Sequence, residues 1–69
     1  MEKEILDQDL IDFCQWFKDH FGKAESYECA MLTCLCGRFH TFPKQAKGLL
    51  SRIVGLGLAM VKKHIVYLK

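Results

Sequence analysis

The sequence lacks several features that define large classes of protein. It contains no asparagine, so it has no acceptor site for N-linked glycosylation. Its longest stretches without a charged residue, 29–37 and 53–61, are too short for a membrane-spanning helix, which needs about 20 apolar residues. Residues 1–9 are rich in acidic side chains, unlike the basic and then apolar start of a secretory signal. These absences predict a cytoplasmic protein whose cysteines are reduced thiols.

Acidic residues are also absent from residue 29 onward. All eight lie in residues 1–28 together with three lysines, so this part carries a net charge of −5, whereas residues 29–69 hold seven basic residues and carry +7. Such complete segregation predicts a basic half that meets a polyanion. Alternatively, an acidic helix lies against a basic one, and both interpretations can hold together.

The chain is short and rich in apolar residues. It has 69 residues, of which 51% are hydrophobic. This length makes one domain with a thin core. Some apolar surface is therefore expected to stay exposed, which predicts a protein partner or a homodimer.

Residues 4–21 show the spacing of an amphipathic helix. Apolar side chains recur at steps of three and four residues and so share one face, while aspartates occupy the water side. Gly22 is a natural end for this helix. The apolar positions of the face are Leu6, Leu10, Phe13, Phe17 and Phe21.

Three further helices are expected, at 26–37, 43–54 and 58–68. Ser26 suits the N-cap of the first, and Pro43 suits the opening turn of the second. A strand is the alternative for 26–37, because a short apolar run does not settle the period, but Ala, Met and Leu favour a helix. The sequence therefore predicts an all-α fold, a compact bundle of four short helices in one domain over residues 1–69.

The last two predicted helices form a helix-turn-helix hairpin. A tight turn between helices needs a glycine, because one turn residue often has a positive φ, and Gly55 is placed to supply it. Ser51, four residues earlier, lets the helices approach, and Val61, six residues later, anchors the second helix onto the first.

The segments Gly55-Leu56 and Val61-Lys62-Lys63-His64-Ile65, with Leu68, resemble helix-turn-helix and winged-helix domains of transcription regulators and replication initiators. The resemblance covers residues 30–68. It implies a small regulatory protein that binds DNA through its basic C-terminal half.

The sequence departs from that pattern where base contacts are expected. Leu58, Ala59 and Met60 are apolar, and residues 57–69 contain no Arg, Asn or Gln for bidentate contacts to bases. The chain also ends with the predicted helix, which leaves no room for a β-wing. Phosphate contact is less affected. The candidate DNA-binding residues are Lys44, Lys47, Arg52, Lys62, Lys63 and His64.

The outer face of the predicted last helix is apolar, which favours contact with protein. The alternative function is therefore a protein–protein interaction module, as a homodimer or as a small inhibitor or adaptor. Its contact residues are Ala59, Met60, Val66 and Tyr67.

The cysteines offer a further alternative. Cys29, Cys34, Cys36 and His40 could form a zinc-stabilised site, but the C-x4-C-x-C-x3-H spacing matches no common zinc pattern. We expect the cysteines to be small apolar residues, with no metal and no cofactor. Cys14 lacks a histidine with an orienting group, so no enzyme and no small-molecule substrate are predicted.

Residues 48–63 combine basic and apolar side chains, as membrane-surface helices do. Gly55 and Gly57 interrupt this stretch, and its apolar residues are needed for a core. No membrane contact is therefore predicted.

Overall fold

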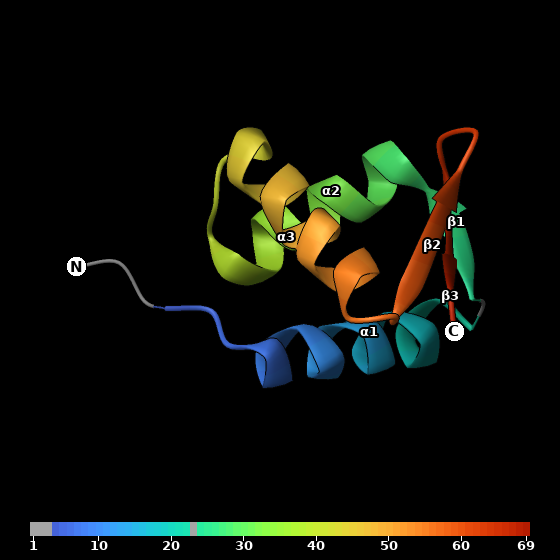
Figure 1. Cartoon of the computed structure of the whole chain (residues 1–69), viewed down its shortest axis with the longest axis horizontal. Coiled ribbons are helices and arrows are strands. Elements are labelled where there is room, and N and C mark those ends of the chain that lie inside the picture. The colour runs from blue at the N-terminus through green and yellow to red at the C-terminus, as the bar shows by residue number, and fades with distance from the viewer. Residues whose placement is uncertain (1–3, 23) are drawn as a thin grey trace.

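A computed structural model describes residues 4–22 and 24–69 and shows an α+β fold (Figure 1). These residues contain three helices and three short strands. Their order is α1 (Asp7–Phe21), β1 (Glu25–Tyr27), α2 (Glu28–Phe39), α3 (Pro43–Gly55), β2 (Ala59–Lys62) and β3 (Ile65–Leu68). The predicted all-α bundle of four helices is therefore wrong.

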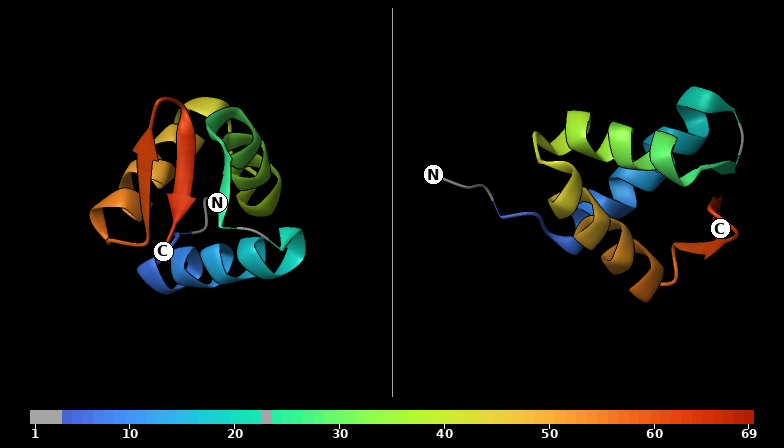
Figure 2. Two further views of the ribbon diagram at one scale, coloured as in Figure 1. Left: turned by 90° about the vertical axis from the view of Figure 1, so that its right-hand side faces the viewer. Right: turned by 90° about the horizontal axis from the view of Figure 1, so that it is seen from above.

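The strands form one antiparallel sheet with β3 in the centre, in the order β1-β3-β2. Ser26 of β1 and Val61 of β2 both pair with Val66 of β3, from opposite sides. The helices lie on one side of this sheet, and the left view of Figure 2 shows the strands in front with the helices behind and below them.

The predicted helix 58–68 is instead the β2–β3 hairpin. Val61, Ile65 and Val66 are β-branched, and this type of side chain fits a pleated strand better than a helix. Burial alternates along the hairpin, so that Val66 and Leu68 face the core while Tyr67 between them is exposed. Burial in this segment therefore repeats every two residues, as in a strand, although the spacing of Leu58, Val61, Ile65 and Leu68 had indicated a helix.

The helix-turn-helix hairpin expected around Gly55 is consequently absent. Gly55 is the last residue of α3, and Gly57 takes the positive φ, 77°, in the turn that leads into β2. A short connection between two helices is found only from α2 to α3, at residues 40–42 within the described part of the chain. The prediction that the chain ends in a helix is also wrong, because the β2–β3 hairpin occupies residues 59–68.

The other helices are close to their predicted positions. α1 ends at Gly22, whose φ of 66° confirms it as the C-cap, and α3 begins at Pro43 as expected. α2 begins two residues later than predicted, because Ser26, expected as an N-cap, lies in β1. Edge pairing with β3 therefore holds the residues just before α2 in an extended conformation.

Two helix starts are fixed by a side chain that reaches back one turn. The Asp9 carboxylate accepts a hydrogen bond of 2.9 Å from the Leu6 backbone N–H, and the Gln45 amide oxygen accepts one of 3.0 Å from the Phe42 N–H. Each satisfies a backbone donor at a helix start. These bonds set where α1 and α3 begin.

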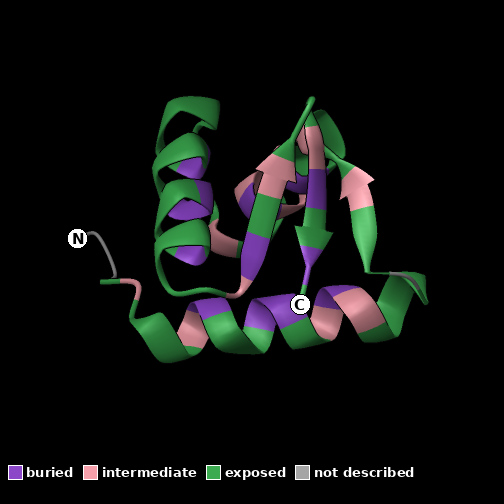
Figure 3. Ribbon diagram, turned by 45° about the vertical axis from the view of Figure 1, so that its right-hand side comes forward, coloured by how far each residue is buried: buried purple, intermediate pink, exposed green. Residues whose placement is uncertain are grey.

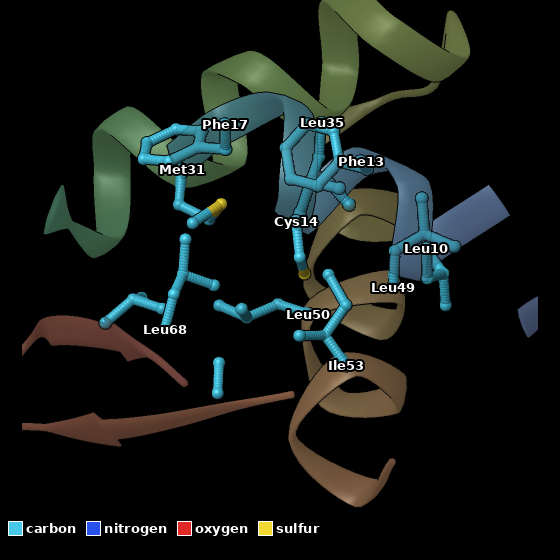
Figure 4. Close-up of a cluster of buried hydrophobic side chains, with 13 residues drawn as sticks. Leu10, Phe13, Cys14, Phe17, Met31, Leu35, Leu49, Leu50, Ile53 and Leu68 are labelled. Carbon is cyan, nitrogen blue, oxygen red and sulfur yellow. The ribbon is translucent and has the colours of Figure 1, made fainter. Parts of the chain in front are cut away.

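The core draws on every element except β1. Figure 4 shows Phe13 and Phe17 of α1 pointing toward Met31 and Leu35 of α2, with Leu68 of β3 beside them. Figure 3 shows the same distribution on the ribbon, with the buried residues of α1 on the face turned toward the sheet and α3. The remaining buried residues are Leu10, Cys14, Ala46, Leu49, Leu50, Ile53, Ala59 and Val66.

Candidate nucleic-acid interface

The exposed face of α3 is basic and otherwise made of small residues. The buried residues Ala46, Leu49, Leu50 and Ile53 pack α3 onto the core. At 3.6 residues per turn, the side chains opposite them share one solvent-facing strip. That strip consists of Lys44, Lys47, Gly48, Ser51 and Gly55, all of them exposed.

Gly48 has no packing reason to be a glycine. A Cβ built at this position would meet nothing within 4 Å, and the backbone there is helical. A glycine in a helix interior destabilises it by about 1 kcal/mol relative to alanine. Gly48 therefore leaves the helix backbone bare directly after Lys47 and one turn after Lys44.

The hairpin turn carries a second local strain. Lys63 and His64 form the two-residue turn and have φ values of 51° and 65°. Such a turn favours Asn-Gly, because residues with a Cβ are disfavoured at positive φ. The His64 carbonyl accepts a hydrogen bond of 2.8 Å from the Glu28 backbone N–H, which ties the turn to the start of α2.

These two basic regions lie on the same side of the molecule. In Figures 1 and 3 the first turn of α3 and the hairpin turn are both at the top, whereas α1 crosses the bottom. The exposed carboxylates of Asp7, Asp12 and Asp19 belong to α1. Much of the acidic charge therefore lies on α1, across the molecule from the hairpin turn, although Glu28 at the start of α2 lies beside that turn.

A groove separates α3 from the hairpin. It has a volume of about 610 Å³ and is lined by α3, by Val61 of β2 and by Glu28 at the start of α2. Lys47, Ser51 and Gly55 form part of its α3 wall. Glu28 is the acidic residue of this groove.

The structure divides the predicted DNA-binding residues among three places. Lys44 and Lys47 are exposed on α3, and Lys63 and His64 occupy the turn. Lys62 ends β2 and is exposed there.

Arg52 has intramolecular partners instead. Its Nη1 donates a hydrogen bond of 2.9 Å to the Ile5 carbonyl, and its Nη2 lies 2.7 Å from Asp7 Oδ1. Arg52 thereby ties the segment before α1 to α3. Both side chains of this pair are exposed, by 41% and 61%, so it contributes at most about 1 kcal/mol to stability.

The predicted protein-contact residues separate into two sets. Met60 and Tyr67 are exposed and pair with each other across β2 and β3. Ala59 and Val66 are buried in the core, because successive residues of a strand point to opposite faces. The last two therefore pack the domain rather than contact a partner.

Gly48, Ser51 and Glu28 were missed as site residues. The signal for Gly48 and Ser51 was present, because both lie opposite the apolar residues of a helix that the sequence does predict at 43–54. Glu28 could not be found this way, since its place beside α3 depends on how α2 packs.

The structure does not bring Cys29, Cys34, Cys36 and His40 together as a metal site. Within residues 4–22 and 24–69, no three His, Cys, Asp or Glu side chains form a group that could hold a metal ion. Cys29 is exposed, whereas Cys14 is buried, and burial raises the pKa of its thiol despite the nearby charge of Lys18. Burial also raises the pKa of Cys34.

The helices of the described residues give no candidate for crossing a bilayer, because none combines the necessary length and apolar character.

Comparison with protein-family models, with curated proteins and with solved structures finds no match to this chain. Its function has to be inferred from its own residues and their arrangement.

Proposed function

We propose that this chain is a DNA-binding domain of the winged-helix kind. In this assignment α2 and α3 form the helix-turn-helix, and the β2–β3 hairpin is the wing. The element order and the sheet order β1-β3-β2 support it, because they resemble the arrangement of such domains. Helix-turn-helix proteins place the second helix of the pair in the major groove while the first crosses the backbone.

The observation that carries the proposal is the single basic surface formed by α3 and the hairpin turn. Lys44 and Lys47 on α3, and Lys63 and His64 in the hairpin turn, are exposed, and the first turn of α3 and the hairpin turn both lie on the upper side of the molecule in Figure 1. The acidic α1 lies at the opposite side, so a phosphate backbone is attracted to one face and repelled by the other. The charge distribution therefore orients the domain on a duplex.

The composition of α3 favours contact with the backbone over reading of sequence. Lys44 and Lys47 can neutralise phosphates on either side of the groove that α3 enters. Gly48 and Gly55 bring the helix backbone close to the duplex, and Ser51 can hydrogen-bond to several bases without distinguishing them. We therefore expect binding that depends strongly on salt and weakly on DNA sequence.

Fluorescence anisotropy with a short labelled duplex tests this proposal. The wild-type protein should bind at about 50 mM salt, and its affinity should fall steeply as salt is raised. The double variant Lys44→Ala, Lys47→Ala should bind more weakly on every duplex. Its slope of log affinity against log salt should be smaller by about 2, since each phosphate contact contributes about 0.9.

Lys69→Ala is the matched control, because it also removes an exposed lysine but lies outside α3 and the hairpin turn. It should retain nearly the wild-type affinity. The proposal fails if the wild-type protein gives no complex at low salt. It also fails if Lys69→Ala weakens binding as much as the α3 double variant.

A further inference from the structure

The central strand of the sheet has no charged side chain, and its one polar group is the hydroxyl of Tyr67. β3 consists of Ile65, Val66, Tyr67 and Leu68, of which Val66 and Leu68 face the core. In an antiparallel sheet with one face in water, the outward positions are normally polar. A continuous apolar strand is instead typical of sheets covered on both faces. The outer positions of β3, Ile65 and Tyr67, are therefore unusually apolar for a face turned to water.

The neighbouring strands extend this apolar surface. The register places Tyr67 between Glu25 and Met60 in one row, and Ile65 between Tyr27 and Lys62 in the next. Side chains of paired residues share a face, so these six form the outer sheet face. Tyr27 is 69% exposed, Met60 52% and Tyr67 37%. Tyr and Met are enriched in the centres of protein interfaces.

No described element of the chain covers the outer sheet face. The left view of Figure 2 looks onto it, and the helices lie behind and below the strands. Figure 1 shows α3 on the far side of the sheet from this face. An occupant of the outer sheet face would therefore leave the exposed strip of α3 open.

The two charges of the face select the occupant. Glu25 lies on one edge strand and Lys62 on the other, and they belong to different rows, so they stand at diagonal corners with the apolar side chains between them. Among the described residues the only ion pair joins Arg52 and Asp7, so neither corner is paired within residues 4–22 and 24–69. The face therefore offers one positive and one negative corner around an apolar centre.

We propose that a second copy of this chain docks on the outer sheet face through a two-fold axis. In a two-fold interface, residue i of one copy meets residue j of the other, and j meets i. Glu25 of each copy then faces Lys62 of the other, and the four uncharged side chains of each face pack against those of its partner in the centre. Both charges are satisfied and β3 is covered on both sides. This proposal does not depend on DNA binding.

The mass of the protein in solution, measured by light scattering without DNA, gives the first test. The expected mass is twice the 8.0 kDa of one chain at high concentration, with a monomer appearing on dilution. The double variant Met60→Ser, Tyr67→Ser should be monomeric at the same concentration, and its circular dichroism should stay that of the wild type because both side chains are exposed. A wild-type monomer at the highest soluble concentration overturns the proposal and leaves the face to another protein.

Charge reversal gives the sharper test. Glu25→Lys and Lys62→Glu each place like charges opposite each other at both corners, so each variant alone should dimerise at least about tenfold more weakly. An equimolar mixture of the two should recover the affinity, because lysines of one then face glutamates of the other. A chain carrying both reversals should recover it as well. If the single variants dimerise as the wild type does, or if mixing restores nothing, the proposed pairing is wrong.

Discussion

α1 and the basic surface, formed by the exposed strip of α3 and the hairpin turn, differ in how well their residues suit the local backbone. α1 begins with a carboxylate that bonds to the backbone in front of it and ends on a glycine with a positive φ, so both of its ends have a favoured residue. The basic surface has a glycine inside α3 without a packing reason, and two residues with side chains at positive φ in the turn. Departures from local preference tend to gather at functional sites, which supports assigning function to this surface.

The largest expected effect is a loss of stability on removing a core side chain from α1. Phe13 is fully buried and packs within 6.0 Å, ring centre to ring centre, of Trp16, Phe17 and Phe39. Phe13→Ala should lower the free energy of unfolding by about 3–5 kcal/mol, because it leaves a cavity in a thin core. Urea denaturation followed by circular dichroism measures this loss.

Ile11→Ala on the same helix is the control, because Ile11 is 40% exposed. It should cost much less than the Phe13 variant. Equal losses from the two would mean that α1 is not held through the face described above.

The second largest effect is a gain of stability, expected from substitutions in the hairpin turn. Replacing Lys63 with Asn and His64 with Gly should raise the free energy of unfolding by about 1–2 kcal/mol, since the new residues suit positive φ. The same double variant should bind DNA more weakly, because it removes the basic side chains of the turn. Urea denaturation and anisotropy on one preparation give both values.

His64→Gly alone separates the two consequences. It should keep much of the stabilisation while retaining Lys63 and most of the affinity. A double variant that is more stable and binds as tightly as the wild type would remove the turn from the proposed interface.

The smallest effects are expected from alanine at two glycines, Gly48 and Gly37, where an added Cβ would make no contact. Gly48 in α3 and Gly37 in α2 are both exposed, and a Cβ at either position would meet nothing within 4 Å. Alanine at each should therefore raise the free energy of unfolding by up to about 1 kcal/mol. Only Gly48→Ala should also reduce DNA affinity, since its methyl group would stand between α3 and the duplex. Equal affinities for the two variants would show that Gly48 does not approach DNA.

Local patterns were enough to place α1 and α3. The spacing of three and four residues between Leu10, Phe13 and Phe17 is that of a helix, and Pro43 marks the first residue of α3. Lys44 and Lys47 could be proposed for DNA contact for the same reason, because a helix at 43–54 carries them whatever surrounds it. The charge polarity followed directly from composition.

Residues 58–68 could not be assigned from local patterns. Leu58, Val61, Ile65 and Leu68 have the spacing of one helix face. In the structure, Val61 and Leu68 lie on the core face of the hairpin, Ile65 lies on the outer sheet face, and Leu58 precedes β2. The β-branched residues were the available signal for strands. The error produced a helix-turn-helix hairpin at residues 43–68 that the structure does not contain, and it placed Ala59 and Val66 on a surface although they are buried.

The sequence by itself determined that the protein has an acidic end and a basic end, an amphipathic first helix and too short a chain to bury all its apolar residues. Tertiary structure alone decided that the last residues become strands, because β3 forms its central ladder with both β1 and β2, and β1 lies far away in the chain. It also decided which lysines share a surface and which apolar side chains remain outside. The physical reason is that pairing across a sheet depends on partners distant in the sequence, so the spacing of apolar residues within one segment does not determine it.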